Sequence, residues 1–149
     1  MNGGLEITTE RAAIDVARVH LYLSEESYWA RGVSYDTVAR SIDHSLCFAG
    51  RIDGDMVAFA RVITDRATFA WICDVFVLEG HRGKGYSKAL VAAIQAHPDL
   101  QDLRRTMLGT ADAKGLYAQF GFTPLKRPQN LMEINHMVFT GRPDPAAAS

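Results

Sequence analysis

The sequence predicts one mixed α+β domain, in which about four helices flank a central, mostly antiparallel sheet of six to seven strands. Three observations lead to this fold class. Between residues 46 and 77, three runs rich in β-branched and aromatic residues follow one another with only short turns between them, which is typical of an antiparallel meander. A glycine-rich turn then leads into a helical pattern, and strand-like and helix-like segments alternate up to residue 139. The chain has 149 residues, enough for one domain with its own core.

The first part of the chain is expected to hold one short strand, residues 5–8, and two helices. Asp15 is a predicted N-cap, because a carboxylate at this place accepts backbone N–H groups of the first turn, and the apolar residues after it recur at helical spacing. Ser34 is the predicted N-cap of the second helix for the same reason. Residues 24–34, between the helices, show no clear period.

The meander is predicted from three β-rich runs, residues 46–52, 56–64 and 68–77. Asp53-Gly54 joins the first two runs, and this dipeptide is a strong signal for a two-residue hairpin turn. Asp65-Arg66 marks the second turn. The three runs are therefore expected to pair as neighbouring antiparallel strands.

The second half of the chain is expected to alternate helices and strands. The helix after the glycine-rich turn should stop before Pro98, which cannot continue it. Asp112 is the predicted cap of a short helix that Gly121 ends. The last predicted strands are residues 105–109, 122–125 and 133–139. The domain is predicted to span residues 1–140, followed by a small-residue tail, 141–149, that is expected to be disordered.

Composition argues against several classes of protein. Lys and Arg number 16 against 17 Asp and Glu, a net charge of −1, whereas nucleic-acid binders usually carry a clear basic excess. No apolar run is long enough for a membrane helix and the N-terminal residues do not resemble a signal peptide, so a cytoplasmic protein without membrane contact is expected. Cys47 and Cys73 are interpreted as buried thiols, and no metal site is expected, because the histidines show no ligand spacing.

Residues 74–90 (DVFVLEGHRGKGYSKAL) are the most informative stretch, because a strand runs through a glycine-rich turn directly into a helix. Glycines allow close approach of the backbone, and the first helical turn presents unpaired N–H groups at the positive end of the helix dipole. Such a turn predicts a pyrophosphate site. A Walker loop does not fit the residues. A Rossmann fingerprint does not fit either, because Lys88 stands where its third glycine belongs and the position of its acidic residue falls in Leu103-Arg104-Arg105.

The turn resembles the R-x-x-G-x-G/A coenzyme A loop of the GNAT superfamily of N-acetyltransferases, matched at Arg82 and Gly85. Ser87 stands where the family usually has Gly or Ala. A second block, residues 112–122, resembles the family's Tyr-x-x-x-Gly-Phe segment. Both blocks occur in the family's order, and the resemblance extends over nearly the whole chain. It implies the GNAT fold and acetyl-CoA as cosubstrate.

The resemblance also implies how the cofactor would be held. The backbone of the third meander strand would hydrogen-bond the pantetheine arm as a neighbouring strand would, and the N–H groups of the turn would surround the pyrophosphate. Arg82 and Lys84 would add charge-assisted contacts. The expected cofactor-binding residues are Val75, Phe76, Val77, Arg82, Gly83, Lys84, Gly85, Tyr86, Ser87, Lys88 and Asp112.

Tyr117 and Asp74 are the candidate catalytic residues. The resemblance places the Tyr117 hydroxyl beside the coenzyme A sulfur, where it would protonate the leaving thiolate; the alternative is a tyrosine that only packs on its helix. Asp74 interrupts an apolar strand, and isolated carboxylates rarely enter such strands. Asp74 is therefore a candidate base or substrate ligand, and the alternative is a structural carboxylate that binds a backbone N–H or pairs with Arg61. A strand N–H near Phe76 or Val77 would meet the oxyanion.

Tyr28 and Trp29, next to two glutamates, are candidates for the acceptor site, since aromatic rings and carboxylates suit a cationic amine. The alternative is a solvated acidic helix end whose rings pack inward. The favoured function is acetyl transfer from acetyl-CoA to a primary amine of a small molecule, by direct attack in a ternary complex, since neither block contains a cysteine. A protein or peptide N-acetyltransferase and a non-catalytic acyl-CoA sensor remain alternatives. A homodimer that exchanges a C-terminal strand is also compatible with the sequence.

Overall fold

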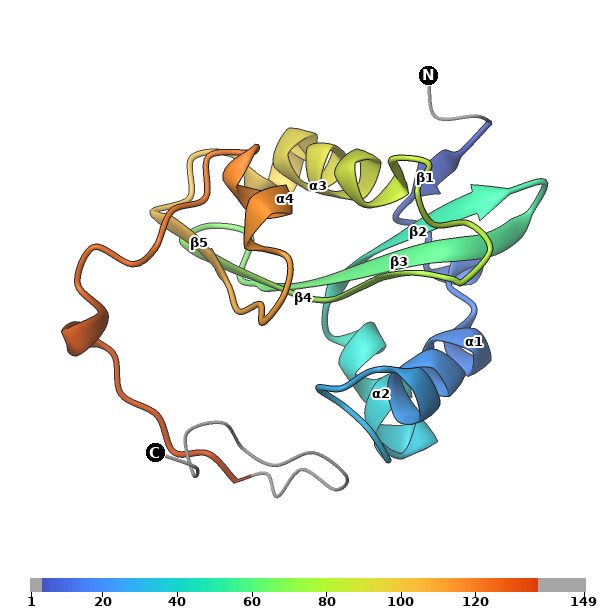
Figure 1. The fold of residues 1–149 in the computed structure, drawn as a ribbon, viewed down its shortest axis with the longest axis horizontal. Helices are drawn as coiled ribbons and strands as arrows, with labels where there is room; N and C mark the ends of the chain where they lie inside the picture. The colour runs from blue at the N-terminus through green and yellow to red at the C-terminus, as the bar shows by residue number, and fades with distance from the viewer. Residues whose placement is uncertain (1–3, 137–149) are drawn as a thin grey trace.

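A single five-stranded sheet forms the centre of the molecule, as the computed structural model, which describes residues 4–136, shows (Figure 1). The strands lie in chain order, the first four are antiparallel, and the fifth pairs in parallel with the fourth. They are β1 (Glu6–Thr8), β2 (Leu46–Ile52), β3 (Asp55–Thr64), β4 (Phe69–Val77) and β5 (Arg105–Leu108). The predicted antiparallel meander is confirmed.

Helices cover both faces of this sheet (Figure 1). They are α1 (Val16–Leu21), α2 (Tyr35–Asp43), α3 (Tyr86–Ala96) and α4 (Lys114–Ala118). One part of the core lies between the sheet and α3, where Phe48 and Ile72 contact the cluster that holds Leu90. The other part joins α1 and α2 to the opposite face, around Phe59 and Phe76. The chain therefore forms three layers, and β4 lies between two apolar layers that fix its position.

The predicted hairpin turn and both predicted helix N-caps are present in the structure. Asp53 and Gly54 have φ angles of 50° and 87°, which are the two positive values of a type I′ hairpin turn. The Asp15 carboxylate accepts the Arg18 N–H at 3.1 Å, and the Ser34 hydroxyl accepts the Thr37 N–H at 3.2 Å, so both predicted N-caps are present.

The aperiodic segment after α1 begins with a turn of π-helix, Tyr22–Glu26. Such turns are rare and often occur near functional sites. The Ser27 hydroxyl then donates to the Leu23 carbonyl at 2.6 Å and accepts the Ala30 N–H at 3.0 Å. These bonds hold the following residues, Tyr28 and Trp29, against the sheet instead of continuing the helix.

The prediction of six to seven strands is wrong, because the sheet has five strands in residues 4–136. Residues 122–125 and 133–136 form no strand, and the rest of the last predicted strand and the tail, 141–149, lie outside the described residues. The physical reason is that a strand needs a neighbour to hydrogen-bond. The chain after α4 passes β5 without pairing with it, because a cavity of about 780 Å³ lies between β5 and residues 120–127. Within residues 4–136, no helix is long and apolar enough to cross a membrane.

Candidate active site

The two central strands of the site, β4 and β5, pair over only four residues and then separate. Their register runs from Phe69 opposite Arg105 to Ile72 opposite Leu108, where β5 ends. β4 continues to Val77 on its own at that edge, while its other edge stays paired with β3. The separation opens the sheet between its last two strands and leaves backbone groups of β4 without a strand partner on that side.

A β-bulge lies where the strands separate. Arg61 faces Cys73 and Phe59 faces Phe76, so β4 has one residue more than β3 in this interval, which is the definition of a bulge. Asp74, within the bulge, has a φ of 52°, a left-handed conformation that non-glycine residues seldom adopt. Backbone strain of this kind is often found at functional sites, and here it turns the strand just beside the opening.

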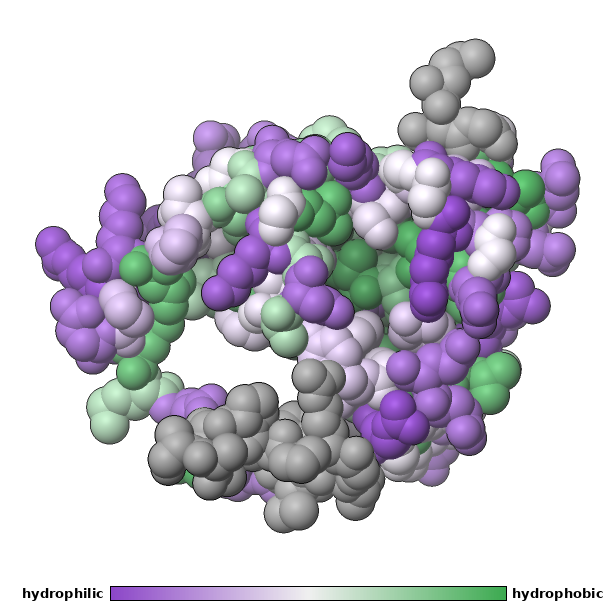
Figure 2. Space-filling model, viewed as in Figure 1, coloured by the Kyte–Doolittle hydropathy of each residue, from purple (hydrophilic) through white to green (hydrophobic). Residues whose placement is uncertain are grey.

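A cavity of about 350 Å³ occupies the opening between the two strands. Both candidate catalytic residues, Asp74 and Tyr117, and both candidate acceptor residues, Tyr28 and Trp29, line it. The structure thus gathers residues from four separate stretches of the chain around one space. In the face drawn in Figure 2, apolar residues lie at the bottom of a hollow between α4 and the glycine-rich turn.

The Asp74 carboxylate is held by two partners. Oδ2 accepts the Arg61 Nε–H at 2.8 Å, and Oδ1 accepts the Trp29 indole N–H at 2.8 Å. The side chain is only 10% exposed, so the ion pair with Arg61 keeps a charge in a poorly solvated place. Each carboxylate oxygen has a further lone pair, and Asp74 can therefore still accept a proton or hydrogen bond from the cavity.

Tyr28 closes the cavity at the side of the helical layer. Its hydroxyl accepts the Ala111 N–H at 3.2 Å, which ties the segment after α1 to the loop between β5 and α4. Its ring stands edge-on to Trp29, with the ring centres 5.0 Å apart. Trp29, Tyr28 and the loop therefore form one connected wall, fixed at its far end by Asp74.

Tyr117 enters the cavity from α4. Its side chain is buried, and burial, together with Tyr28, Asp112 and Cys73 nearby, raises the pKa of its hydroxyl from 10.0 to about 12. Gly121, with a φ of 93°, ends the turn, and the Phe122 N–H bonds the Tyr117 carbonyl at 3.2 Å. The Phe122 ring then packs edge-on against Tyr117, with centres 5.8 Å apart. The Tyr-x-x-x-Gly-Phe pattern thus fixes the tyrosine ring.

Cys73 also lines the cavity. Burial raises the pKa of its thiol, and that of the buried Cys47, from 9.0 to about 12. Since the thiolate is the reactive form, Cys73 is a poor nucleophile at neutral pH. Both cysteines are free thiols, so the structure forms no disulfide between them.

The glycine-rich turn leads into α3 with its N–H groups free. Gly83 and Gly85 have φ angles of 77° and 81°, which favour glycine, and a Cβ on either would meet no atom within 4 Å. The first bond of α3 joins the Ala89 N–H to the Gly85 carbonyl, so the N–H groups of residues 86–88 have no acceptor in the helix. No side chain in the described part of the chain caps this end.

These donors fit a diphosphate. Three unpaired N–H groups, the positive end of an 11-residue helix, and the exposed cations of Lys84 and Lys88 all lie at one turn beside open space. Arg82 has another partner in this structure, because its Nε–H donates to the Val77 carbonyl at 2.9 Å and its Nη2 lies 3.3 Å from the Tyr22 hydroxyl. Arg82 therefore fastens the turn to the end of β4.

The predicted cap of α4 is wrong. Ala113, not Asp112, occupies the cap position, and no side chain caps α4 within the described residues. The helix begins one residue later than predicted, so Asp112 lies before the cap position, and the Thr110 hydroxyl accepts the Ala113 N–H at 3.0 Å. Asp112 is exposed and lines the cavity rim.

Several residues and one hydrogen bond of the site could not be predicted from the sequence. Trp71 and the loop residues Gly109 and Thr110 line the cavity, but none of them belongs to a motif. The tie from Tyr28 to Ala111 links residues 83 positions apart, and only the fold brings them together.

Comparisons with known proteins assign the chain to a family. The model of the acetyltransferase (GNAT) family matches residues 16–122, and this range includes both sequence blocks and every element around the cavity. A protein of Gibberella zeae whose name assigns it to the acetyltransferases is 26% identical over 140 residues, which cover 78% of this chain and 77% of that protein.

Two solved structures are similar in fold. A Xanthomonas campestris pv. campestris protein assigned to the GNAT family is 55% identical, with a TM-score of 0.86 over 88% of this chain and 92% of that one. A Clostridium acetobutylicum acetyltransferase structure that contains acetyl-CoA is 12% identical, with a TM-score of 0.66 over 88% of this chain and 96% of its own; it supports the fold alone. The family match over most of the chain, together with the Xanthomonas relative, shows that this chain belongs to the GNAT acetyltransferase family.

Proposed function

We propose that the protein is an N-acetyltransferase that transfers the acetyl group of acetyl-CoA to a primary amine of a small molecule. The observation that carries this proposal is the cavity in the opened sheet, where Asp74 and Tyr117 face the same space beside a turn that suits a diphosphate. Membership of the family supports acetyl-CoA as the acyl donor.

Binding begins at the glycine-rich turn. The free N–H groups of residues 86–88 and the ammonium groups of Lys84 and Lys88 would hold the pyrophosphate. The backbone of Val75, at the cavity wall, would hydrogen-bond the pantetheine arm, which would lie in the opening as an added strand. Bound in this way, the cosubstrate supplies an activated acetyl group as a thioester.

Asp74 would prepare the acceptor. A primary ammonium with a pKa of about 10.4 must lose its proton before it can attack, at a cost of about 4.6 kcal/mol at pH 7. We propose that the carboxylate first attracts the ammonium and then accepts its proton, directly or through one water. The bonds to Arg61 and Trp29 fix the carboxylate at the cavity wall, so it would meet the acceptor already oriented.

Tyr117 would assist the leaving group. As the nitrogen forms its bond to the carbonyl carbon, the carbon–sulfur bond breaks and its electron pair stays on sulfur. The Tyr117 hydroxyl remains protonated to about pH 12, so it can donate a hydrogen bond to this sulfur at any physiological pH. The thiol finally gains one proton and the nitrogen has lost one, which balances the reaction. A free N–H of β4 near Phe76 or Val77 is the proposed donor to the carbonyl oxygen.

The dimensions of the site favour a small acceptor. A cavity of about 350 Å³ is near the lower limit for ligand sites, and the thioester would occupy part of it. The bond from Tyr28 to Ala111 joins two segments of the cavity wall. The indole and phenol rings of Trp29 and Tyr28 offer faces that suit a cation.

The test is the release of coenzyme A thiol from acetyl-CoA in the presence of a panel of amines. The panel contains small mono- and polyamines and, separately, peptides with a free N-terminus or a lysine. The proposal predicts amine-dependent release with at least one small amine and slower release with every peptide. Faster turnover of peptides would establish the alternative of a protein N-acetyltransferase. Binding of acetyl-CoA without amine-dependent release for any acceptor would support an acyl-CoA sensor.

A further inference from the structure

The cavity in the opened sheet has an apolar wall to which the proposed reaction gives no role. Trp71 and Cys73, two residues apart on β4, face the same side of the sheet, and both line the cavity. Arg61, which bonds Asp74, is opposite Cys73 in the register, and paired residues share a face. The Asp74 carboxylate and the Trp71 ring therefore lie along one face of one strand.

The Trp71 ring is held where β4 and β5 separate. In the register it lies between Ile63 of β3 and Met107 of β5. Gly109 follows β5, and a Cβ there would lie 3.8 Å from Cζ2 and Cη2 of the indole. The half-buried Trp71 donates its indole N–H to no acceptor in the described part of the chain, in contrast to Trp29. Packing therefore positions this ring, and its polar atom is free for a ligand.

The charges that line the cavity disfavour an anionic acceptor. The lining holds two carboxylates, Asp74 and Asp112, and no lysine or arginine of the described residues. Arg61 does not line the cavity, and besides its bond to Asp74 it donates from Nη1 to the Ser45 hydroxyl at 3.1 Å. A carboxylate on the acceptor would therefore lose its water without gaining a cationic partner.

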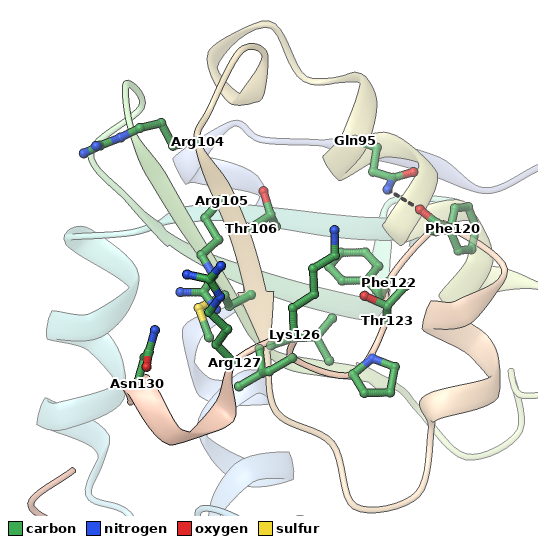
Figure 3. A pocket seen from close by; sticks show the side chains of 15 residues that line it. Gln95, Arg104, Arg105, Thr106, Phe120, Phe122, Thr123, Lys126, Arg127 and Asn130 are labelled. Carbon is green, nitrogen blue, oxygen red and sulfur yellow. Dashed lines mark hydrogen bonds between the residues drawn. The ribbon is translucent and has the colours of Figure 1, made fainter. Parts of the chain in front are cut away.

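A second ammonium group on the acceptor would find no good partner either. The next residue of β4 on this face is Phe69, which is paired with Arg105 in the register. Arg105 also lines the hollow of about 780 Å³ beside β5 (Figure 3). The cationic residues of this hollow, which has no acidic residue in its described lining, are Arg104, Arg105, Lys126 and Arg127. A polyamine that extended past Trp71 would approach these like charges, and the exposed Asp112 at the cavity rim is screened by water.

We propose that Trp71 selects the acceptor, which is a primary monoamine that carries an aromatic ring and no carboxylate, with its ring on the indole and its nitrogen at Asp74. This inference rests on the proposed function, because it names the acceptor class of the same site. Two strand residues span about 7 Å, so a linker of about two or three carbons would join the ring to the nitrogen. Aromatic rings attract each other beyond the effect of buried area, which favours a ring over an alkyl chain.

The test compares 2-phenylethylamine with ethylamine, which lacks the ring, in the thiol-release assay. Phenylalanine and putrescine complete the set, because the first adds a carboxylate to 2-phenylethylamine and the second replaces the ring with another ammonium group. The wild type should have a kcat/KM for 2-phenylethylamine about 10- to 100-fold above that for ethylamine. It should acetylate phenylalanine and putrescine more slowly than 2-phenylethylamine.

Variants of Trp71 assign this preference to the ring. Trp71→Ala should bring the kcat/KM values of the two amines within about threefold of each other, mainly through a higher KM for 2-phenylethylamine. Trp71→Phe keeps a ring and should retain most of the preference. Phe69→Ala is the matched control, since Phe69 is a 36% exposed ring on the same face of β4 that does not line the cavity. It should leave the ratio unchanged. The ratio separates specificity from folding, because a loss of folded protein lowers both rates alike.

The inference would be overturned by a wild type that does not prefer 2-phenylethylamine, or by faster acetylation of putrescine or phenylalanine. A preference that Trp71→Ala leaves intact, or that Phe69→Ala removes, would also overturn it. If no amine is acetylated, the proposed function fails, and calorimetric titration of the two amines in the presence of coenzyme A decides the inference separately. Tighter binding of 2-phenylethylamine than of ethylamine, weakened by Trp71→Ala, would support the site for the ring, and any other result would overturn it.

Discussion

Tyr117→Phe removes one hydroxyl from the cavity and leaves the ring in place. The ring is 7% exposed and packs against Phe122, and the hydroxyl has no hydrogen-bond partner within residues 4–136. Phenylalanine should therefore keep the fold, and a change in rate can be assigned to the lost donor. The proposed function predicts a lower kcat with an almost unchanged KM for acetyl-CoA.

The size of this effect follows from two pKa values. The hydroxyl has a pKa of about 12, whereas a thiol has one of about 8.5, so complete proton transfer to the thiolate is unfavourable by about 4.8 kcal/mol. Tyr117 should therefore act as a hydrogen-bond donor to the developing negative charge. Such a bond contributes about 1.5–3 kcal/mol, which corresponds to a loss of about 10- to 150-fold in kcat. KM changes little because the bond forms mainly in the transition state.

The assay is steady-state thiol release with the best amine of the panel, measured for the wild type, Tyr117→Phe and Tyr35→Phe. Tyr35, the first residue of α2, is a suitable control because it is 47% exposed and its ring contacts His20 of α1, away from the cavity. Thermal unfolding of all three proteins checks that the fold is intact. A Tyr117→Phe enzyme with more than half of the wild-type kcat would refute the assignment of Tyr117. A loss beyond about 10⁴-fold would refute the hydrogen-bond argument, because it exceeds what one donor contributes.

Three further predictions concern the groups around the cavity. Asp74→Asn should lower kcat/KM by about 100-fold or more and flatten the rise of kcat/KM with pH, as expected for loss of a base. Asp43→Asn, which alters a surface ion pair, should change neither quantity. An Asp74→Asn enzyme that loses stability but keeps the pH profile would make Asp74 a structural residue. Cys73→Ser should retain acetyl transfer, because the raised thiol pKa of about 12 leaves roughly one thiolate in 10⁵ at pH 7, and an acetylated Cys73 trapped by mass spectrometry would contradict direct attack. Folding stability, measured as the urea midpoint, should fall as the pH rises from about 9 towards 12. The folded chain keeps the protons of Cys47, Cys73 and Tyr117 up to about pH 12, whereas the unfolded chain, with pKa values of 9.0 for the thiols and 10.0 for the tyrosine, releases them earlier and binds fewer protons. A midpoint that stays constant to pH 11 would contradict the burial of these groups.

Local signals made much of the fold predictable from the sequence. The caps at Asp15 and Ser34 and the turn at Asp53-Gly54 depend on atoms within a few residues of each other, and these contacts form wherever the segment lies. The glycine-rich turn was predictable for the same reason, since positive φ angles and free N–H groups at a helix start are local properties.

The geometry of the site was only partly predictable, because long-range contacts create it. Asp74 stood out as a carboxylate in an apolar strand, and pairing with Arg61 was one of the two interpretations that the sequence left open. Its bond to Trp29 spans 45 positions, and the bulge that turns it toward the cavity appears only in the register of β3 and β4. The interpretation of Tyr28 and Trp29 as site residues remains a prediction that the shared cavity supports.

The number of strands could not be predicted because it depends on pairing, not on composition. Residues 133–139 have the residue types of a strand, yet a segment becomes a strand only when a neighbour completes its ladder.

The central claim is that the turn before α3 holds the pyrophosphate of the cosubstrate, and calorimetric titration of acetyl-CoA tests it most directly. Three proteins are compared: the wild type, Gly85→Glu and Gly54→Glu. Both glycines have positive φ angles, 81° and 87°, so both variants strain the backbone and add one negative charge, but Gly54 lies in the hairpin between β2 and β3. The account predicts tight binding by the wild type and Gly54→Glu, and affinity at least about a hundredfold weaker in Gly85→Glu. Equal affinity in all three proteins, or no heat with the wild type, would contradict it.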